Sequence, residues 1–204
     1  MSGVEPRIPF TVAITGASGA PYAVRLLEQL CVAGQRVSLL VSSHGFRLLA
    51  TETGIESIDA LREAVGGRAW DDLITVYDDA DRGAAPASGS ARSAGMVICP
   101  CSMGTLSAIA AGSSRSLVER AADVTLKERR KLILVPRETP LSSIHLENML
   151  KLSMAGVVIL PAAPGFYHQP KSIPELVDFV VARVLDQMGV EHSLGHRWGA
   201  EQDT

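Results

Sequence analysis

A short glycine-containing turn, Gly16-Ala17-Ser18-Gly19, lies between an apolar segment at residues 11–14 and apolar residues with helical spacing at 22–30. This order predicts a strand, a tight turn and a helix. Unpaired N–H groups and the positive end of the helix dipole would meet at the turn, as in sites that bind nucleotide phosphates. The turn has two glycines, as GxxG, rather than the three of the dinucleotide pattern, and it lacks a P-loop lysine. A purely structural turn in an α/β domain remains the alternative.

Two cations, Arg120 and Lys127, lie seven positions apart in a helix predicted over residues 116–129. Seven residues are close to two helical turns, so both side chains would share a face, with Val124 between them. Beside Arg137-Glu138 they could hold a phosphate dianion, each charge-assisted hydrogen bond contributing about 1.5–3 kcal/mol. The alternative is a solvated charged face, because acids of the same helix could pair with both cations. Those acids are Glu119, Asp123 and Glu128.

The remaining groups with possible chemistry are two cysteines and two histidines. Cys99 and Cys101 are not joined by a CxxC motif or a second cysteine pair, so Cys99 is expected to pack as a small apolar residue. His192 and His196 lie four positions apart, but a glycine separates them and no acidic helix is near. A tail or subunit contact is expected there, and we expect no metal site. No GxSxG nucleophile elbow is present.

Short apolar segments along the chain predict the strands that would position these groups. The segments at residues 96–99, 132–135 and 157–160 are apolar throughout, which is typical of strands covered on both faces of a parallel sheet. Each is followed by a proline, which we expect to end the strand. Further strands are predicted at residues 36–41 and 73–77. We therefore expect an α/β protein with a single Rossmann-like domain over residues 1–204, a parallel sheet with helices on both faces.

Small and polar residues follow the predicted strands, and the carboxyl edge of a parallel sheet is where such folds bind ligands. Serines follow the second strand, where an NAD site needs an acid, so a mononucleotide is favoured over NAD. Predicted helices at residues 46–53 and 55–65 follow, the first carrying Glu52 near its end. Residues 78–92 form a polar loop that is either filler or a lid. The edge would collect Gly16 to Ser18, Ser42, residues 101–105, Arg137, Glu138 and residues 162–167.

Length and composition limit the classes of function. The chain has 204 residues and a net charge of −3, which argues against nucleic acid or an anionic membrane as the main partner. No apolar run reaches the ~18 residues that span a bilayer. The 3 cysteines, an odd number, suit a reducing cytoplasm better than a disulfide framework. Helices rich in small residues could pack closely on neighbouring subunits, so oligomerisation is expected.

Several motifs, in order, carry a resemblance to a known family. The chain resembles the flavin prenyltransferase (UbiX) family over roughly residues 8–200. The matching stretches are TGASGA (15–20), ATET (50–53), PASGS (86–90), CPCSMGTLSAIAAG (99–112), ERAADVTLKERR (119–130), LVPRETPLSSIHLENMLKLS (134–153), ILPAAPGFYHQP (159–170) and RWG (197–199). A flavoprotein version of the Rossmann-like fold is implied by this resemblance.

The resemblance also implies an activity. It implies a transferase that takes reduced FMN as prenyl acceptor and dimethylallyl phosphate as donor, without a metal. The five-carbon unit would be joined to N5 and C6 of FMN, and prenylated FMN would serve a UbiD-type decarboxylase. A cytoplasmic homo-oligomer, a dodecamer with sites at subunit junctions, is implied as well.

Site residues follow from motif position within the resemblance. FMN contacts are implied for Gly16, Ala17, Ser18, Ser42, Ser102, Met103, Gly104, Thr105 and Arg137. The prenyl phosphate would be surrounded by Arg120, Lys127, Glu138, Tyr167 and Arg183. Catalytic roles are implied for Glu52, Lys127, Glu138 and Ser18, with Glu52 arriving from a neighbouring subunit. Since a five-carbon tail gives only about 4 kcal/mol of burial, recognition must rest heavily on the phosphate.

One departure from the family pattern concerns the loop before PASGS. Some members carry a tryptophan there that faces the prenyl group, whereas this chain has Asp81-Arg82-Gly83. Two other functions stay open beside the prenyltransferase. One is an FMN-dependent decarboxylase acting on a cysteine-containing or aromatic acid, although such cysteine decarboxylases have a PASANT-like loop in place of PASGS. The other is a non-catalytic carrier that delivers FMN to a partner.

Overall fold

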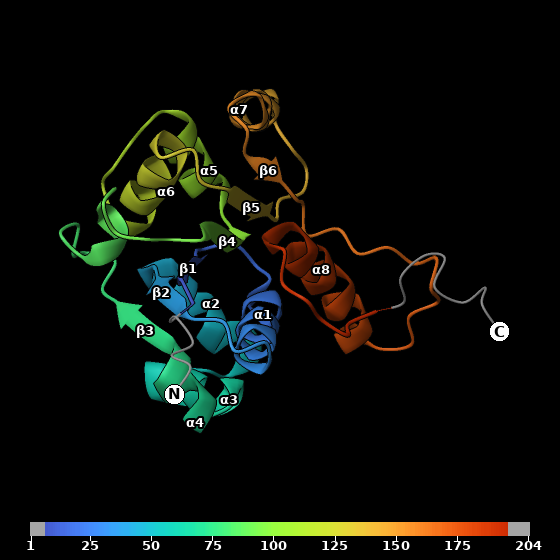
Figure 1. Cartoon of the computed structure of the whole chain (residues 1–204). Coiled ribbons are helices and arrows are strands. Elements are labelled where there is room, and N and C mark those ends of the chain that lie inside the picture. Colours follow the sequence, from blue (N-terminus) through green and yellow to red (C-terminus); the bar gives the residue numbers. More distant parts are fainter. Residues whose placement is uncertain (1–6, 196–204) are drawn as a thin grey trace.

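The computed structural model describes residues 7–195, and in this range the strands form one parallel sheet. The 6-stranded sheet has the order β3-β2-β1-β4-β5-β6. The chain therefore moves outward from β1 to one edge, returns to pair β4 with β1, and continues to the other edge (Figure 1). The strands are β1 (Phe10–Ile14), β2 (Val37–Val41), β3 (Ile74–Tyr77), β4 (Gly95–Cys101), β5 (Leu132–Pro136) and β6 (Val158–Ile159).

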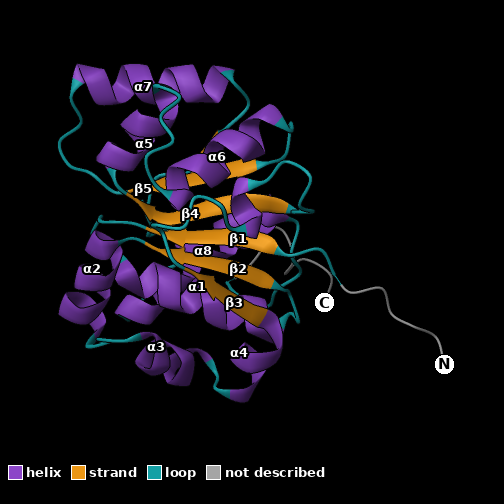
Figure 2. Cartoon of the chain, turned by 90° about the vertical axis from the view of Figure 1, so that its left-hand side faces the viewer, coloured by secondary structure: helices purple, strands orange, loops and turns teal. Residues whose placement is uncertain are grey.

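Helices cover both faces of this sheet, as the sequence predicts (Figure 2). Helices α1 and α8 pack together on one face, and α5 and α6 lie across the sheet from them (Figure 1). The helices are α1 (Ala20–Val32), α2 (Ser43–Thr53), α3 (Ile58–Val65), α4 (Arg68–Leu73), α5 (Met103–Ala110), α6 (Leu117–Lys127), α7 (Ser143–Met154) and α8 (Ile173–Met188), with a 3₁₀ turn η1 (Ala85–Ala87).

Each face of the sheet has its own hydrophobic core. Alternate strand residues point to opposite faces, so Val12 packs with α1 and α8 whereas Ala13 packs with α5 and α6. Cys99 and Cys101 are both fully buried but lie in opposite cores, because the irregularity in β4 after Ile98 interrupts the alternation between them. Burial raises the pKa of the Cys99 thiol to about 12. The prediction that Cys99 packs as a small apolar residue is confirmed.

Serine residues begin most of the long helices. The hydroxyl groups accept a hydrogen bond from the backbone N–H three positions later, which satisfies one of the donors that a helix start leaves unpaired. These N-cap residues are Ser42, Ser57, Ser102, Ser116, Ser142 and Ser172. Helix α2 ends at Gly54 with φ of 72°, a left-handed conformation that favours glycine.

The structure corrects several bounds of the predicted elements, most clearly at Pro100 and at Leu73. Strand β4 does not end at Pro100 but continues to Cys101, with an irregularity in its pairing to β5 after Ile98. Proline is tolerated because the ladder is interrupted there. Leu73 belongs to the short helix α4, which the sequence pattern did not predict, and β3 begins at Ile74.

Within residues 7–195, no helix has the length and apolarity needed to cross a membrane.

Candidate functional site

The loops after β1 and β4 meet where the strand order reverses, the usual ligand position in this type of fold. Thr15 holds the two loops together. Its backbone N–H and its hydroxyl both donate to the Pro100 carbonyl, at 3.2 and 3.0 Å, and its Oγ1 accepts from the Ser102 N–H at 2.9 Å. The positions of the first predicted loop and of Ser102 are therefore fixed relative to each other.

The loop after β1 also lies tightly against the start of α2. A Cβ at Gly16 would be 2.5 Å from His44 Cβ, and a Cβ at Gly45 would overlap the Ile14 carbonyl oxygen. Ser42 caps α2 by accepting from the Gly45 N–H at 3.1 Å. Glycine at these two positions lets the chain segments approach this closely. The predicted loop residues 16–18 and Ser42 are thus brought to one place.

Glu52 occupies the start of α1. Its Oε2 atom accepts from the backbone N–H groups of Gly19 and Ala20, both at 2.8 Å. The sequence predicts an anion at this helix start, and the chain itself supplies one in the Glu52 carboxylate. These contacts lie within one chain, and a contribution of Glu52 to the site of a neighbouring subunit stays a prediction. Helix α2 follows β2, which pairs with β1, so Glu52 of the same chain lies beside α1.

The pKa of Glu52 is lowered by this environment. Burial alone would raise the pKa, but several contacts outweigh it. The Ser18 side chain and the Gly19 and Ala20 N–H groups donate hydrogen bonds to the carboxylate, and the positive charge of Arg137 is nearby. Glu52 is therefore ionised at neutral pH, and its negative charge compensates the positive end of α1.

The start of α5 is a second helix start at the same edge. Ser102 Oγ accepts from the Thr105 N–H at 3.2 Å and lies 3.0 Å from Thr105 Oγ1. A Cβ at Gly104 would have no neighbour closer than Ser102 Oγ at 3.9 Å, so space is open beside this turn. The other N–H groups of the first turn, including that of Met103, have no intrahelical partner in an α-helix. This open helix start fits a phosphate group.

Arg137 joins the loop after β5 to the loop after β1. Its Nε donates to the Ser18 carbonyl oxygen at 3.2 Å. The next residue, Glu138, is exposed, and its Oε1 accepts from the Thr139 N–H at 3.0 Å. Two more of the predicted residues thus lie at the carboxyl edge.

Arg120 and Lys127 do not join this group within one chain. Helix α6 ends at Lys127, close to the start of β5 and to the amino edge of the sheet. Arg120 lies about 10 Å away along the helix axis. Arg120 pairs with Asp123 at 2.8 Å, and Lys127 pairs with Glu128. Asp123 and Glu128, two of the three acids predicted as alternative partners, therefore pair with these cations, whereas Glu119 pairs with Arg115.

Tyr167 and Arg183 form a third group on the outer side of α8. Both line a cavity of about 810 Å³. The Tyr167 ring packs edge-on against Phe179 with centroids 5.8 Å apart, and Arg183 pairs with Asp186 at 2.9 Å. His192 Nε2 lies 3.2 Å from the other oxygen of Asp186. Two predicted donor-binding residues therefore share a cavity that is separate from the carboxyl edge.

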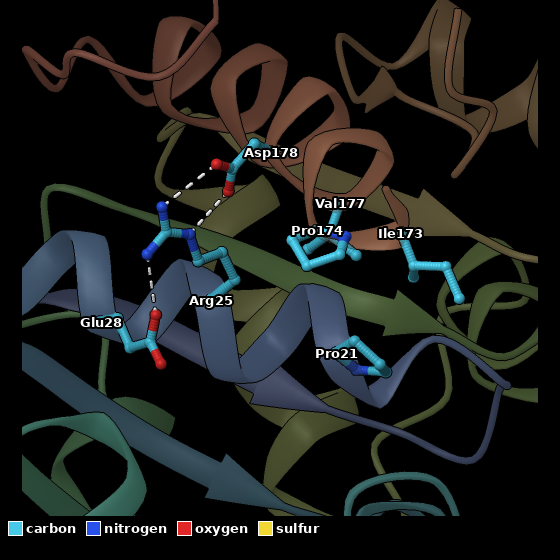
Figure 3. Close-up of a pocket in the computed structure, with 7 residues that line it drawn as sticks. All are labelled: Pro21, Arg25, Glu28, Ile173, Pro174, Val177 and Asp178. Atoms are coloured by element: carbon cyan, nitrogen blue, oxygen red, sulfur yellow. Dashed lines mark hydrogen bonds and ion pairs between the residues drawn. The ribbon is translucent and has the colours of Figure 1, made fainter. Parts of the chain in front are cut away.

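A contact between α1 and α8 was not predicted. Arg25 of α1 donates from Nε and Nη2 to Asp178 of α8, at 2.6 and 3.1 Å, and from Nη1 to Glu28 at 3.0 Å (Figure 3). These three residues, with Pro21, Ile173, Pro174 and Val177, line a cavity of about 410 Å³. The i,i+3 spacing of Arg25 and Glu28 is visible in the sequence, but Asp178 is 153 positions from Arg25. The pair fixes α8 against the helix that begins at the candidate site.

Asp79 is a second residue that the sequence did not single out. It follows β3, and its carbonyl and Oδ1 accept from the N–H groups of Leu117 and Val118, at 2.7 and 2.8 Å. The loop with Asp81-Arg82-Gly83 is thereby attached to the start of α6, and Arg82 Nη1 lies 3.4 Å from the Ser114 carbonyl. The sequence near α6 carries no signal for this contact, because Asp79 lies 39 positions before Val118.

Two remaining points concern metal ligands and the C-terminal residues. In the part of the chain from 7 to 195, no three His, Cys, Asp or Glu side chains form a group that could hold a metal ion. His196 and the RWG stretch at 197–199 lie outside the described residues.

Comparison of the whole chain with known proteins shows its family. The family model described as Flavoprotein matches residues 2–185. A flavin prenyltransferase UbiX of Pseudomonas aeruginosa is 54% identical over 208 residues, covering 98% of this chain and 97% of that protein. The UbiX of Methanothermobacter thermautotrophicus is 48% identical over 187 residues, covering 92% and 93%.

Solved structures agree with these relatives. A dodecameric FMN-dependent UbiX-like decarboxylase from Escherichia coli O157:H7 has a TM-score of 0.86 and 44% identity, covering 94% of this chain and 99% of its own. AnUbiX (PadA1), in complex with FMN and dimethylallyl pyrophosphate, has a TM-score of 0.82 and 39% identity, covering 94% and 100%. The cysteine decarboxylase TvaF, at 18% identity and a TM-score of 0.59, shares the fold alone. Because about half of its residues are identical to those of these relatives over nearly the full length, this chain belongs to the UbiX flavin prenyltransferase family.

Proposed function

We propose that this protein transfers a dimethylallyl group from dimethylallyl phosphate to N5 and C6 of reduced FMN. The observation that supports this most directly is the convergence of three loops at the carboxyl edge. Thr15 links the loops after β1 and β4, and Arg137 links the loop after β5 to Ser18. Family membership supplies the reaction type. We propose that residues 1–204 act as a single FMN-binding domain and that prenylated FMN serves a UbiD-type decarboxylase.

The FMN phosphate is assigned to the start of α5 rather than to that of α1. The N–H groups of Gly19 and Ala20 already bind Glu52, whose charge would repel a phosphate. The start of α5 has open space beside Gly104 and two hydroxyl groups, those of Ser102 and Thr105. The remaining flavin contacts would come from Gly16, Ala17, Ser18, Ser42, Met103 and Arg137.

Reduced FMN supplies nucleophilic N5 and C6 atoms when bound, and the chain supplies the environment for the donor. Cationic and hydroxyl side chains would bind the donor phosphate and stabilise the charge that develops on its oxygen as the allylic C–O bond breaks. Glu138 would move a proton or orient Lys127. Water must be excluded, because it would capture an allylic cation. The donor-binding residues would be Arg120, Lys127, Glu138, Tyr167 and Arg183.

The complete site would need more than one subunit. Lys127 lies near the amino edge of its own sheet, whereas Arg137 and Glu138 follow β5 at the carboxyl edge. Lys127 would therefore serve the site of a neighbouring subunit. A relative with 44% identity is described as dodecameric, and we propose the same assembly here. A reducing cytoplasm would suit the three free cysteines, which are all buried.

A second candidate function is an FMN-dependent decarboxylase. This possibility is favoured by the relative from E. coli, which is described as an FMN-dependent UbiX-like decarboxylase. Under that function the protein would release CO2 from a cysteine-containing or aromatic acid and leave the flavin unchanged. A protein that only carries FMN would do neither.

Incubation of the purified protein with reduced FMN and dimethylallyl phosphate, without oxygen, separates these functions. Mass spectrometry of the extracted flavin should show FMN heavier by one five-carbon unit. A Lys127→Ala variant should form this product more slowly while retaining its FMN, because Lys127 is assigned to the donor phosphate. Unchanged flavin with CO2 release from an added acid would support the decarboxylase, and neither product would leave the carrier.

A further inference from the structure

The segment Ser88-Gly89-Ser90 of the PASGS motif lies against the end of α6. Arg130 Nη2 donates to the Gly89 carbonyl oxygen at 2.7 Å, and Ser88 Oγ lies 2.9 Å from Ser90 Oγ. Arg129, with φ of 55°, reverses the chain after the helix, so that the Arg130 N–H donates to the Thr125 carbonyl at 2.9 Å. The backbone of Gly89 is thus held in a defined position beside the last turn of α6.

Gly89 leaves room for two charged side chains. A Cβ at this position would overlap Glu128 Oε1 and would lie 2.7 Å from Lys127 Nζ. Both atoms are at the far ends of flexible side chains, so an alanine would displace these ends and leave the backbone where it is. Gly89 is not among the glycines with positive φ. The need for glycine here is therefore steric and concerns this pair of side chains.

Lys127 and Glu128 form the ion pair that occupies this space. The two side chains are 48% and 34% exposed, so the ammonium is accessible to a ligand. The hydrogen bond and charge of Lys127 lower the pKa of Glu128, so the Glu128 carboxyl group is ionised at neutral pH. The position of the Lys127 ammonium therefore depends on Glu128 on one side and on the bare backbone of Gly89 on the other.

We propose that Gly89 is a positioning residue for Lys127: its missing side chain lets the ammonium lie against the PASGS loop in the place from which it binds the donor phosphate. The inference rests on the proposed function, in which Lys127 contacts that phosphate. Gly89 acts only through Lys127, so replacing Gly89 matters only when Lys127 is present.

A double-mutant cycle of Gly89→Ala and Lys127→Ala tests this directly. Dimethylallyl phosphate is titrated calorimetrically into the full-length protein loaded with oxidised FMN, which cannot be prenylated during the titration. Gly89→Ala should weaken donor binding about tenfold, the lower end of what losing one charge-assisted hydrogen bond costs. In the Lys127→Ala background the same replacement should weaken binding no further. FMN content and melting temperature should match the unmutated protein in each single variant.

Ala94→Ser is the matched control. Like Gly89→Ala it adds one heavy atom, and Ala94 is an exposed residue at the end of the same loop, outside the PASGS motif. This variant should bind the donor normally. If Gly89→Ala does not fold, Glu128→Ala tests the same contact from the other side and should weaken binding about threefold, again only when Lys127 is present.

Three results would overturn the inference. One is donor binding that Gly89→Ala leaves unchanged, and another is an equal loss in both Lys127 backgrounds, which would indicate a general structural role. The third is a Lys127→Ala variant that binds the donor normally. None of these depends on turnover, whereas the proposed function fails separately if the unmutated protein produces no prenylated FMN.

Discussion

Replacement of Glu52 by glutamine removes a negative charge from the start of α1 and leaves an acceptor oxygen of the same shape. The carboxylate accepts from the Gly19 and Ala20 N–H groups, both at 2.8 Å. A hydrogen bond to a charged group contributes about 1.5–3 kcal/mol and a neutral one about 0.5–1.5 kcal/mol. Because Glu52 is only partly buried, we expect a total loss of about 1–2 kcal/mol.

The assay is thermal unfolding of the FMN-free protein, followed by circular dichroism. For a chain of this length, the expected loss lowers the melting temperature by about 3–6 °C at pH 7. Glu56→Gln is the matched control, since Glu56 is an exposed carboxylate at the end of the same region and has no hydrogen bond or ion pair among the described residues. Its melting temperature should be unchanged.

The difference between Glu52 and its glutamine variant should also depend on pH. The pKa of Glu52 is lower in the folded protein than in the unfolded chain. Its charge therefore stabilises the fold fully above the unfolded pKa of about 4.3, and this contribution is lost as the pH falls through the folded pKa. The two melting temperatures should converge in acid. A difference that is the same at pH 7 and in acid, or no difference at all, would refute the reasoning.

Three further perturbations test the site and the helix that supports it. Ser18→Asp places a second carboxylate beside Glu52 and in the proposed flavin-binding loop, so the purified variant should contain little FMN. A normal flavin absorbance would contradict the role of this loop. Gly45→Ala places a Cβ over the Ile14 carbonyl oxygen, a backbone atom that cannot easily move. The free energy of unfolding, measured in urea, should fall by about 1–3 kcal/mol. An unchanged midpoint would contradict that contact. Arg25→Met and Asp178→Asn should each destabilise the protein by about 1 kcal/mol and show coupling in a double-mutant cycle that weakens at high salt; additive losses would mean that the pair contributes nothing.

Much of the fold could be predicted because its signals are local. Continuous apolar segments predict buried parallel strands, and a residue such as Ser102 before a helical pattern predicts where a helix begins. One exception is β4, which continues through Pro100 because its pairing with β5 is irregular there. That irregularity depends on the neighbouring strand and has no signature in residues 96–101.

The candidate site was predicted less completely, because several of its contacts join residues that are far apart in the sequence. Loop residues at the ends of strands share an edge by topology, so the meeting of Ser18 and Arg137 could be expected. The contact of Glu52 with Gly19 joins positions 33 apart and depends on how α2 lies beside α1. The position of Lys127 follows from the direction of α6, which runs toward the start of β5. A helical face alone does not give that direction.

The most direct test of the account is a crystal structure of the protein with FMN and dimethylallyl phosphate. We predict the flavin at the loops after β1 and β4, with its phosphate at the start of α5 beside Ser102 and Thr105. We also predict Lys127 of a neighbouring subunit at the donor phosphate. A flavin bound away from this edge, or a donor phosphate that no Lys127 approaches, would contradict it.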